Sequence, residues 1–139
     1  MRNPTLVLKR IVPRRTRPAT PEAIHLVNIG SSRLRIADWM IVHMSPDGRH
    51  LHTFKFPFEI KGDWQWTVGA GDVIVVFSGK GLEAEFTESS EERTGEFRFS
   101  WGLNHPIWTN VEDTVAVRDE DGVVITEARV RALIERGGP

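Results

Sequence analysis

Three histidines around one turn are the first residues in this chain that could do chemistry. His50 and His52 are two positions apart, so they share a face of an expected strand, and His43 lies on the strand before the turn. Neutral imidazoles that converge can bind zinc, with Asp38 as the nearest acidic ligand. Whether His43 joins the pair depends on the register of the turn. Histidines at a solvated strand end are the commoner arrangement, so no metal site is predicted.

Other motifs that are typical of enzymes are incomplete. The segment Gly79–Ala84 follows a strand and fits a glycine-rich dinucleotide pattern, but no helical face continues after it to hold a pyrophosphate. Asp119–Gly122 is similar to part of a calcium loop but lacks the later ligands, so it is predicted to be a hairpin turn. The chain has no cysteine, no Gly-x-Ser-x-Gly elbow and no set of residues that suggests a triad. We therefore expect neither catalysis nor a cofactor.

The beginning of the chain is strongly basic. Six basic residues and no acidic ones precede Glu22, and because the net charge of the whole chain is −1, the remainder carries an excess of acidic residues. Such an arm can bind nucleic acid by neutralising phosphates, lie on its own domain, or stay solvated. Its prolines favour an extended backbone, with Leu6–Val12 as a candidate edge strand. The candidate nucleic-acid residues are Arg2, Lys9, Arg10, Arg14, Arg15 and Arg17.

Tryptophans offer a second candidate binding surface. Trp64 and Trp66 lie two apart beside the polar segment Lys61–Asp63, and they are the tryptophans expected to be exposed. An exposed indole pair on a β-sandwich can stack on sugar rings or on a peptide. Trp39 and Trp101 are expected to lie in the core, because tryptophans bury large apolar areas.

Length and composition indicate one soluble domain. A chain of 139 residues can bury a substantial core without disulfides. The chain contains no signal-peptide pattern and no apolar run of about 20 residues, so a cytoplasmic location is expected.

Short β-strands separated by turns account for most of the chain. Hairpins are expected at Ser45–Gly48 and at Asp121-Gly122, where proline, aspartate and glycine favour tight turns. The apolar run within Asp72–Phe77 should be a central buried strand, and the acidic segment Leu82–Gly95 an exposed loop. The end, Ala128–Arg136, fits either a strand or a short helix. The other expected strands are Glu22–Ile29, Trp39–Met44, His50–Phe56, Glu96–Trp101, Thr114–Arg118 and Val123–Thr126.

This pattern predicts an all-β fold, an immunoglobulin-like β-sandwich of about eight to nine short strands. The expected organisation is a basic, proline-containing arm at residues 1–21, the sandwich at 22–130 and a tail at 131–139.

The order of these signals resembles the lamin tail domain family, in the form of a stand-alone prokaryotic-type member. The resemblance covers about Glu22–Ile125 and departs from the family in the basic arm and in the long acidic loop. It implies an immunoglobulin-like sandwich and a non-catalytic module for protein or chromatin contacts. No coiled-coil rod precedes the domain, so it does not imply filament assembly. The matching segments are Glu22–Asn28 with Gly30, Leu34–Trp39, Phe54–Pro57, Ala70–Phe77 and Trp108–Val124.

The first functional expectation is therefore a module that binds a protein partner or a second copy of itself through a sheet edge or an apolar patch. Nucleic-acid binding by the basic arm is the alternative, and carbohydrate binding by Trp64 and Trp66 is a third. The sequence leaves the partner and the oligomeric state open.

Overall fold

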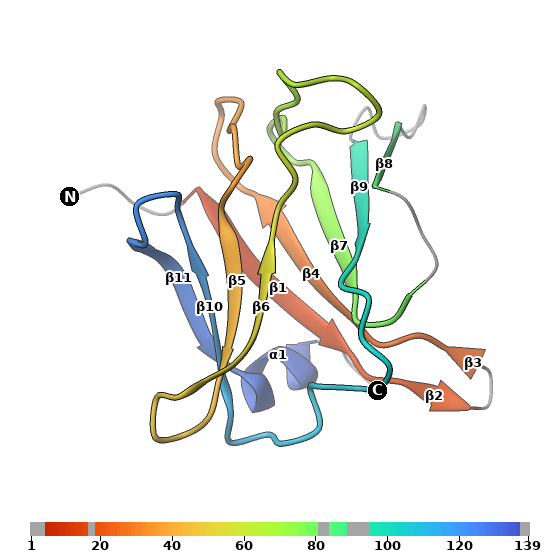
Figure 1. Cartoon of the computed structure of the whole chain (residues 1–139), viewed down its shortest axis with the longest axis vertical. Coiled ribbons are helices and arrows are strands. Elements are labelled where there is room, and N and C mark those ends of the chain that lie inside the picture. The colour runs from red at the N-terminus through yellow and green to blue at the C-terminus, as the bar shows by residue number, and fades with distance from the viewer. Residues whose placement is uncertain (1–4, 17–18, 81–83, 89–94, 137–139) are drawn as a thin grey trace.

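Two β-sheets packed face to face form the body of the computed structural model, which describes residues 5–16, 19–80, 84–88 and 95–136 (Figure 1). The larger sheet has, in spatial order, β1 (Leu6–Val12), β4 (Ala23–Asn28), β7 (Val73–Phe77), β9 (Gly95–Ser100) and β8 (Glu85–Glu88). The smaller sheet has β11 (Val124–Arg129), β10 (Thr114–Arg118), β5 (Met40–Met44) and β6 (His50–Lys55). The predicted all-β sandwich is confirmed, and the described residues form nine strands in its two main sheets.

Both hairpin turns form where the sequence places them. Gly48 has a φ of +86° between β5 and β6, and Gly122 has a φ of +82° between β10 and β11. Glycine adopts this left-handed region without the steric penalty that a side chain would impose. The Oδ1 atom of Asp119 also accepts hydrogen bonds from the backbone N–H groups of Asp121 and Val123, both at 2.9 Å. These turns fix β5–β6 and β10–β11 as antiparallel neighbours.

Strand β7 is central, as its uninterrupted apolar sequence predicts. It pairs antiparallel with β4 on one side and parallel with β9 on the other. The segment between β7 and β9 includes β8, which pairs antiparallel with β9. The prediction of a loop throughout Leu82–Gly95 is therefore wrong at Glu85–Glu88. Phe86 explains the difference, because its ring packs 4.5 Å from the ring of Phe97 and holds this acidic segment to the sheet.

The core lies between the two sheets and includes part of the basic arm. Strand β1 occupies an edge of the larger sheet, as expected, and Leu6 and Ile11 are fully buried. Residues 6–12 therefore belong to the sandwich, and the segment that lies outside its two sheets is shorter than the predicted arm of residues 1–21. The largest fully buried side chains are those of Trp108, Phe56 and Phe99.

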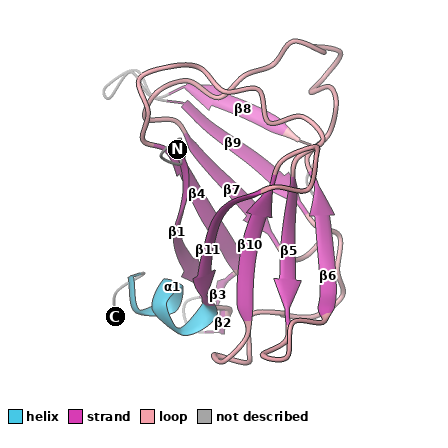
Figure 2. Cartoon of the chain, turned by 90° about the vertical axis from the view of Figure 1, so that its left-hand side faces the viewer, coloured by secondary structure: helices cyan, strands magenta, loops and turns pink. Residues whose placement is uncertain are grey.

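The C-terminal segment changes from strand to helix. Strand β11 runs to Arg129, and α1 follows at Val130–Arg136. Val130 and Leu133 of α1 are buried, so residues expected to form a tail pack on the sandwich instead. Figure 2 shows α1 at the lower ends of β1 and β11, both of which it contacts. None of the helical structure in the described ranges has the length and apolar character that a membrane crossing requires.

Candidate functional site

A buried glutamate joins three segments that are far apart in the sequence. Glu22, before β4, accepts hydrogen bonds through Oε1 from the Ser78 hydroxyl at 2.6 Å and from the Ile107 N–H at 2.8 Å. Its Oε2 accepts from the Trp108 N–H at 3.2 Å. A buried carboxylate is tolerated when donors surround it in this way. Glu22 therefore holds the 101–108 loop against the larger sheet, and this arrangement makes it a structural residue.

Two further buried polar side chains hold the loops at the opposite end of the sandwich. Asn28 donates from Nδ2 to the carbonyl oxygens of Ser32 and Val68, both at 3.0 Å. Asp72 accepts from the N–H groups of Gly69 and Gly95, each at 2.7 Å. Their side chains satisfy backbone groups that the strands leave unpaired.

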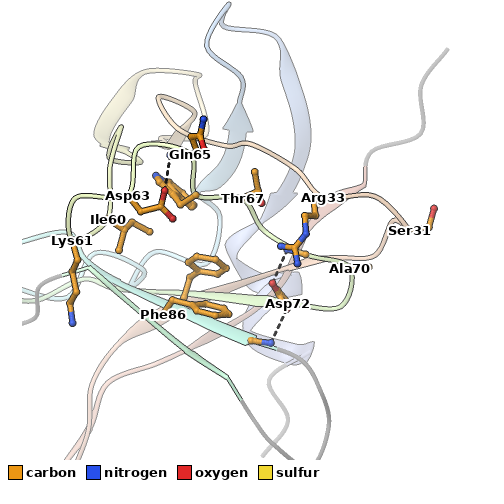
Figure 3. A pocket seen from close by; sticks show the side chains of 14 residues that line it. Ser31, Arg33, Ile60, Lys61, Asp63, Gln65, Thr67, Ala70, Asp72 and Phe86 are labelled. Atoms are coloured by element: carbon orange, nitrogen blue, oxygen red, sulfur yellow. Dashed lines mark hydrogen bonds between the residues drawn. The ribbon is translucent and has the colours of Figure 1, made fainter.

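These loops frame a pocket of about 710 Å³ (Figure 3). Trp66, Phe97 and Phe86 form its aromatic side. Figure 3 shows Arg33 above Asp72 and Lys61 pointing away from the pocket. Each carboxylate oxygen of Asp72 accepts one of these backbone hydrogen bonds, and the lining of the pocket also includes the polar or charged side chains of Arg33, Asp63 and Gln65.

The expected exposed pair of tryptophans does not exist. Trp64 is 57% exposed, but Trp66 is 4% exposed and packs against Phe97 and Phe99. The indole Nε1 of Trp66 donates to the carbonyl oxygens of Pro57 and Phe58 at 3.1 and 3.2 Å. The two residues lie in a segment without strand structure, where a spacing of two does not place side chains on one face. The double platform proposed for a sugar is therefore absent.

The structure brings together two of the three histidines. Nδ1 of His43 lies 3.0 Å from Nδ1 of His52, and Nε2 of His43 lies 2.7 Å from Oδ2 of Asp113. His50 is exposed and pairs with Met44 beyond a register shift that follows His43. In the described ranges, no three His, Cys, Asp or Glu side chains are placed to hold a metal ion. Sequence reasoning missed Asp113, which is 70 residues from His43.

The basic residues of the arm divide between two environments. The short hairpin of β2 (Arg15–Thr16) and β3 (Ala19–Thr20) projects at the lower right of Figure 1, with Arg14 and Arg15 exposed. Lys9 is also exposed. Arg2 and Arg17 lie outside the described residues, as does part of the Gly79–Ala84 motif.

Arg10 instead belongs to β1 of the larger sheet, where it lies opposite His25 of β4. Its Nε donates to Nδ1 of His25 at 3.2 Å. The pKa of His25 is lowered to about 4, mainly by burial and then by the positive charge of Arg10. Glu96 opposes the shift, and Lys9 adds a smaller lowering effect. A neutral imidazole suits this contact, because the guanidinium can donate but cannot accept a hydrogen bond.

The two-sheet architecture defines an immunoglobulin-like β-sandwich, in which the buried carboxylates of Glu22 and Asp72 accept hydrogen bonds from backbone N–H groups of the loops. The chain belongs to the lamin tail domain family: the family model described as Lamin Tail Domain matches residues 1–131, nearly the whole chain. The match includes β1, in agreement with the place of this strand in the sandwich. No curated protein matches the chain significantly.

Proposed function

We propose that this chain is a non-catalytic interaction module that binds an extended segment of a protein partner along strand β6. The observation that supports this proposal most strongly is the position of β6 at the edge of the smaller sheet. An edge strand presents backbone donors and acceptors that an added strand can pair with.

The direction of these backbone groups follows from the residue next to β6. Phe56 donates its N–H to the Trp39 carbonyl and accepts from the Asp38 N–H, so its polar backbone groups point towards the β5 side. Backbone groups alternate sides along an antiparallel strand. Lys55 and Thr53 therefore direct their N–H and C=O groups away from β5.

Other edges of the sandwich are less suitable. Strands β1 and β11 contact each other, and α1 packs against both of them. Strand β8 has four residues, and the segments that flank it lie outside the described ranges. By contrast, β6 has six residues and carries Leu51, which is 43% exposed. The backbone of β6 can form hydrogen bonds with a partner strand, and Leu51 adds an apolar contact.

Replacing Thr53 with proline tests the proposal, because proline removes the outward N–H and leaves the bonds to β5 in place. The matched control is Thr53→Val, which retains the N–H. We expect cross-linking in extracts of the native host to join a partner to β6 in the valine variant, and the yield to fall about tenfold or more in the proline variant. Hydrogen exchange of the Thr53 and Lys55 amides should slow in the purified complex.

Equal cross-linking of both variants, with no added amide protection in β6, would exclude this strand as the binding edge. Sedimentation equilibrium of the free chain separates binding of another protein from self-association. A dimer that Thr53→Pro dissociates would identify a second copy as the partner.

A second candidate function is nucleic-acid binding by the β2–β3 hairpin. The specific observation in its favour is that Arg14 and Arg15 are exposed on this projecting hairpin, and neither forms a salt bridge with a described carboxylate. Unpaired guanidinium groups on a projection are suited to phosphate contacts. The acidic remainder of the chain opposes broad binding to a polyanion, so any contact would be confined to this hairpin.

Charge removal in the double variant Arg14→Gln/Arg15→Gln tests this second function. If the hairpin contacts two phosphates, affinity for a DNA duplex should fall, and the slope of log K against log salt should decrease by about 2. Lys55→Gln, an exposed cation elsewhere on the surface, is the control and should leave the slope unchanged. Absence of salt-dependent binding to DNA or RNA by the parent chain would eliminate this function.

A further inference from the structure

A hydrogen-bonded chain of three side chains connects β6 to the interior. Oδ2 of Asp113, beside the start of β10, lies 2.7 Å from Nε2 of His43 on β5, whose Nδ1 lies 3.0 Å from Nδ1 of His52 on β6. Asp113 is 4% exposed and His43 is 2% exposed. The planes of the His43 and His52 rings differ by 8°, and the Trp108 ring lies 4.7 Å from the His43 ring.

This geometry fixes the tautomers of both imidazoles. An ionised carboxylate can only accept, so Nε2 of His43 must carry the hydrogen that is donated to Asp113. Nδ1 of a neutral His43 is then an acceptor, and Nδ1 of His52 must be the donor. When both imidazoles are neutral, the hydrogen bonds from His43 to Asp113 and from His52 to His43 can both form. Nε2 of His52 then keeps a free lone pair.

The Asp113, His43 and His52 side chains can take up one added proton and keep both hydrogen bonds between them. If His52 takes the proton on Nε2, its Nδ1 still donates to His43. If His43 takes the proton on Nδ1, His52 can become the acceptor by moving its own hydrogen to Nε2. In both cases the carboxylate of Asp113 balances the added positive charge.

A second added proton has no such solution. Both Nδ1 atoms would then carry hydrogen while separated by 3.0 Å, so two donors would face each other. Two positive rings would share one carboxylate, and one of these rings is almost fully buried. The contact between His43 and His52 must then open, since these atoms can no longer form a hydrogen bond.

Burial and the neighbouring imidazoles oppose this second protonation. Burial lowers the pKa of His52 below its ordinary value of 6.5, and the nearby imidazoles of His43 and His105 lower it further. The His105 ring lies 6.0 Å from that of His52, on the 101–108 loop. The other rings that pack here, Trp101 and Trp108, carry no charge.

Among the residues that the structure describes, the acidic groups near these three side chains do not supply a second counter-charge. Glu112, next to Asp113, pairs with Arg129 of β11 and Arg131 of α1. His50 on β6 is exposed, and the register shift separates it from the His43–His52 pair. Asp47 in the β5–β6 turn pairs with Arg49. Asp113 is therefore the carboxylate on which the two imidazoles depend.

We propose that Asp113, His43 and His52 form a proton-operated latch on β6, which holds this strand against β5 with up to one added proton and releases it when a second proton binds. Because the folded pKa of His52 lies below its unfolded value, the unfolded state binds more protons over this range. The contribution to stability is therefore present above the ordinary imidazole pKa and is lost as the pH falls below it. If β6 is the edge that binds a partner, acidification removes that edge; this consequence alone rests on the proposed function.

Nuclear magnetic resonance of the free, full-length chain tests the latch. Long-range nitrogen–proton spectra at about pH 7.5 should show the hydrogen on Nε2 of His43 and on Nδ1 of His52. Between about pH 7 and 5, the protection of the His52 and Phe54 amides, corrected for intrinsic exchange, should fall about tenfold relative to that of amides in β10.

Two variants separate the latch from a general effect of acid. Glutamine in His52→Gln can donate to Nδ1 of His43 but does not titrate, so it should remove the extra pH dependence of β6. His50→Gln removes an exposed imidazole from the same strand and should leave that dependence intact. Opposite tautomers, or protection in β6 that falls in parallel with β10, would overturn the proposal. These measurements use no partner, so failure of partner binding cannot be mistaken for failure of the latch.

Discussion

Replacing Glu22 with alanine is expected to lower the free energy of unfolding by about 3 to 5 kcal/mol, because the substitution leaves buried donors without an acceptor. The carboxylate receives hydrogen bonds from the Ser78 hydroxyl and from the N–H groups of Ile107 and Trp108. Hydrogen bonds to a charged group contribute about 1.5 to 3 kcal/mol each, and they are not additive within one network. Urea denaturation, with the loss measured at constant slope, provides the test.

Two control substitutions make the Glu22 result specific. Glu22→Gln keeps the size of the side chain and one acceptor oxygen, but it directs an amide group towards the remaining donors, so we expect an intermediate loss. Glu120→Ala removes an exposed glutamate from the β10–β11 turn and should change stability by less than about 0.5 kcal/mol. A loss for Glu22→Ala as small as that for Glu120→Ala would show that the 101–108 loop does not depend on this carboxylate.

Sequence patterns located the hairpins and the central strand because these features depend on local chemistry. The turns need glycine at a positive φ, and β7 is an uninterrupted apolar run, so both can be recognised from a few neighbouring residues. Strand β8 is different: its sequence is acidic and has one aromatic anchor, Phe86, whose contact with Phe97 appears only once β9 is in place. Tertiary pairing here overrides a composition that favours a loop.

The hydrogen bonds of the buried polar side chains were harder to predict, because their partners are distant in the sequence. Glu22 reaches residues 56 to 86 positions away, and His43 reaches Asp113 across 70 positions. The register shift after His43 explains why His52, rather than both histidines of β6, meets it. A slip of one residue reverses the faces of a strand, so parity alone could not settle which imidazoles converge.

The burial of the tryptophans also could not be predicted from residue spacing alone. Trp66 was expected at the surface and is buried, whereas Trp101 was expected in the core and is partly buried against it. Trp108, recognised as part of the closing family signature, is the largest of the fully buried side chains. Spacing gives the relative direction of two side chains within a regular strand, but Trp64, Trp66, Trp101 and Trp108 all lie outside strands.

Replacing Trp108 with alanine is expected to destabilise the fold by about 3 to 5 kcal/mol, because it removes a fully buried indole from between the two sheets. The ring packs 5.8 Å from Trp101 and 4.7 Å from His43, so the cavity would open beside both. Its Nε1 has no hydrogen-bond partner within the described residues. Trp108→Phe removes that unpaired N–H together with part of the ring, and it should therefore cost much less than the alanine substitution.

Comparison of three tryptophan variants by thermal and urea unfolding tests this order of burial. Trp101→Ala should cost about 1 to 3 kcal/mol, since this side chain is only partly buried, and Trp64→Ala less than about 0.5 kcal/mol, since it is mostly exposed. An equal loss for Trp108→Ala and Trp101→Ala would contradict the difference in their burial. The order Trp108, Trp101, Trp64 would show that stability depends on the interior between the sheets, which leaves the exposed Trp64 available for contacts that do not affect folding.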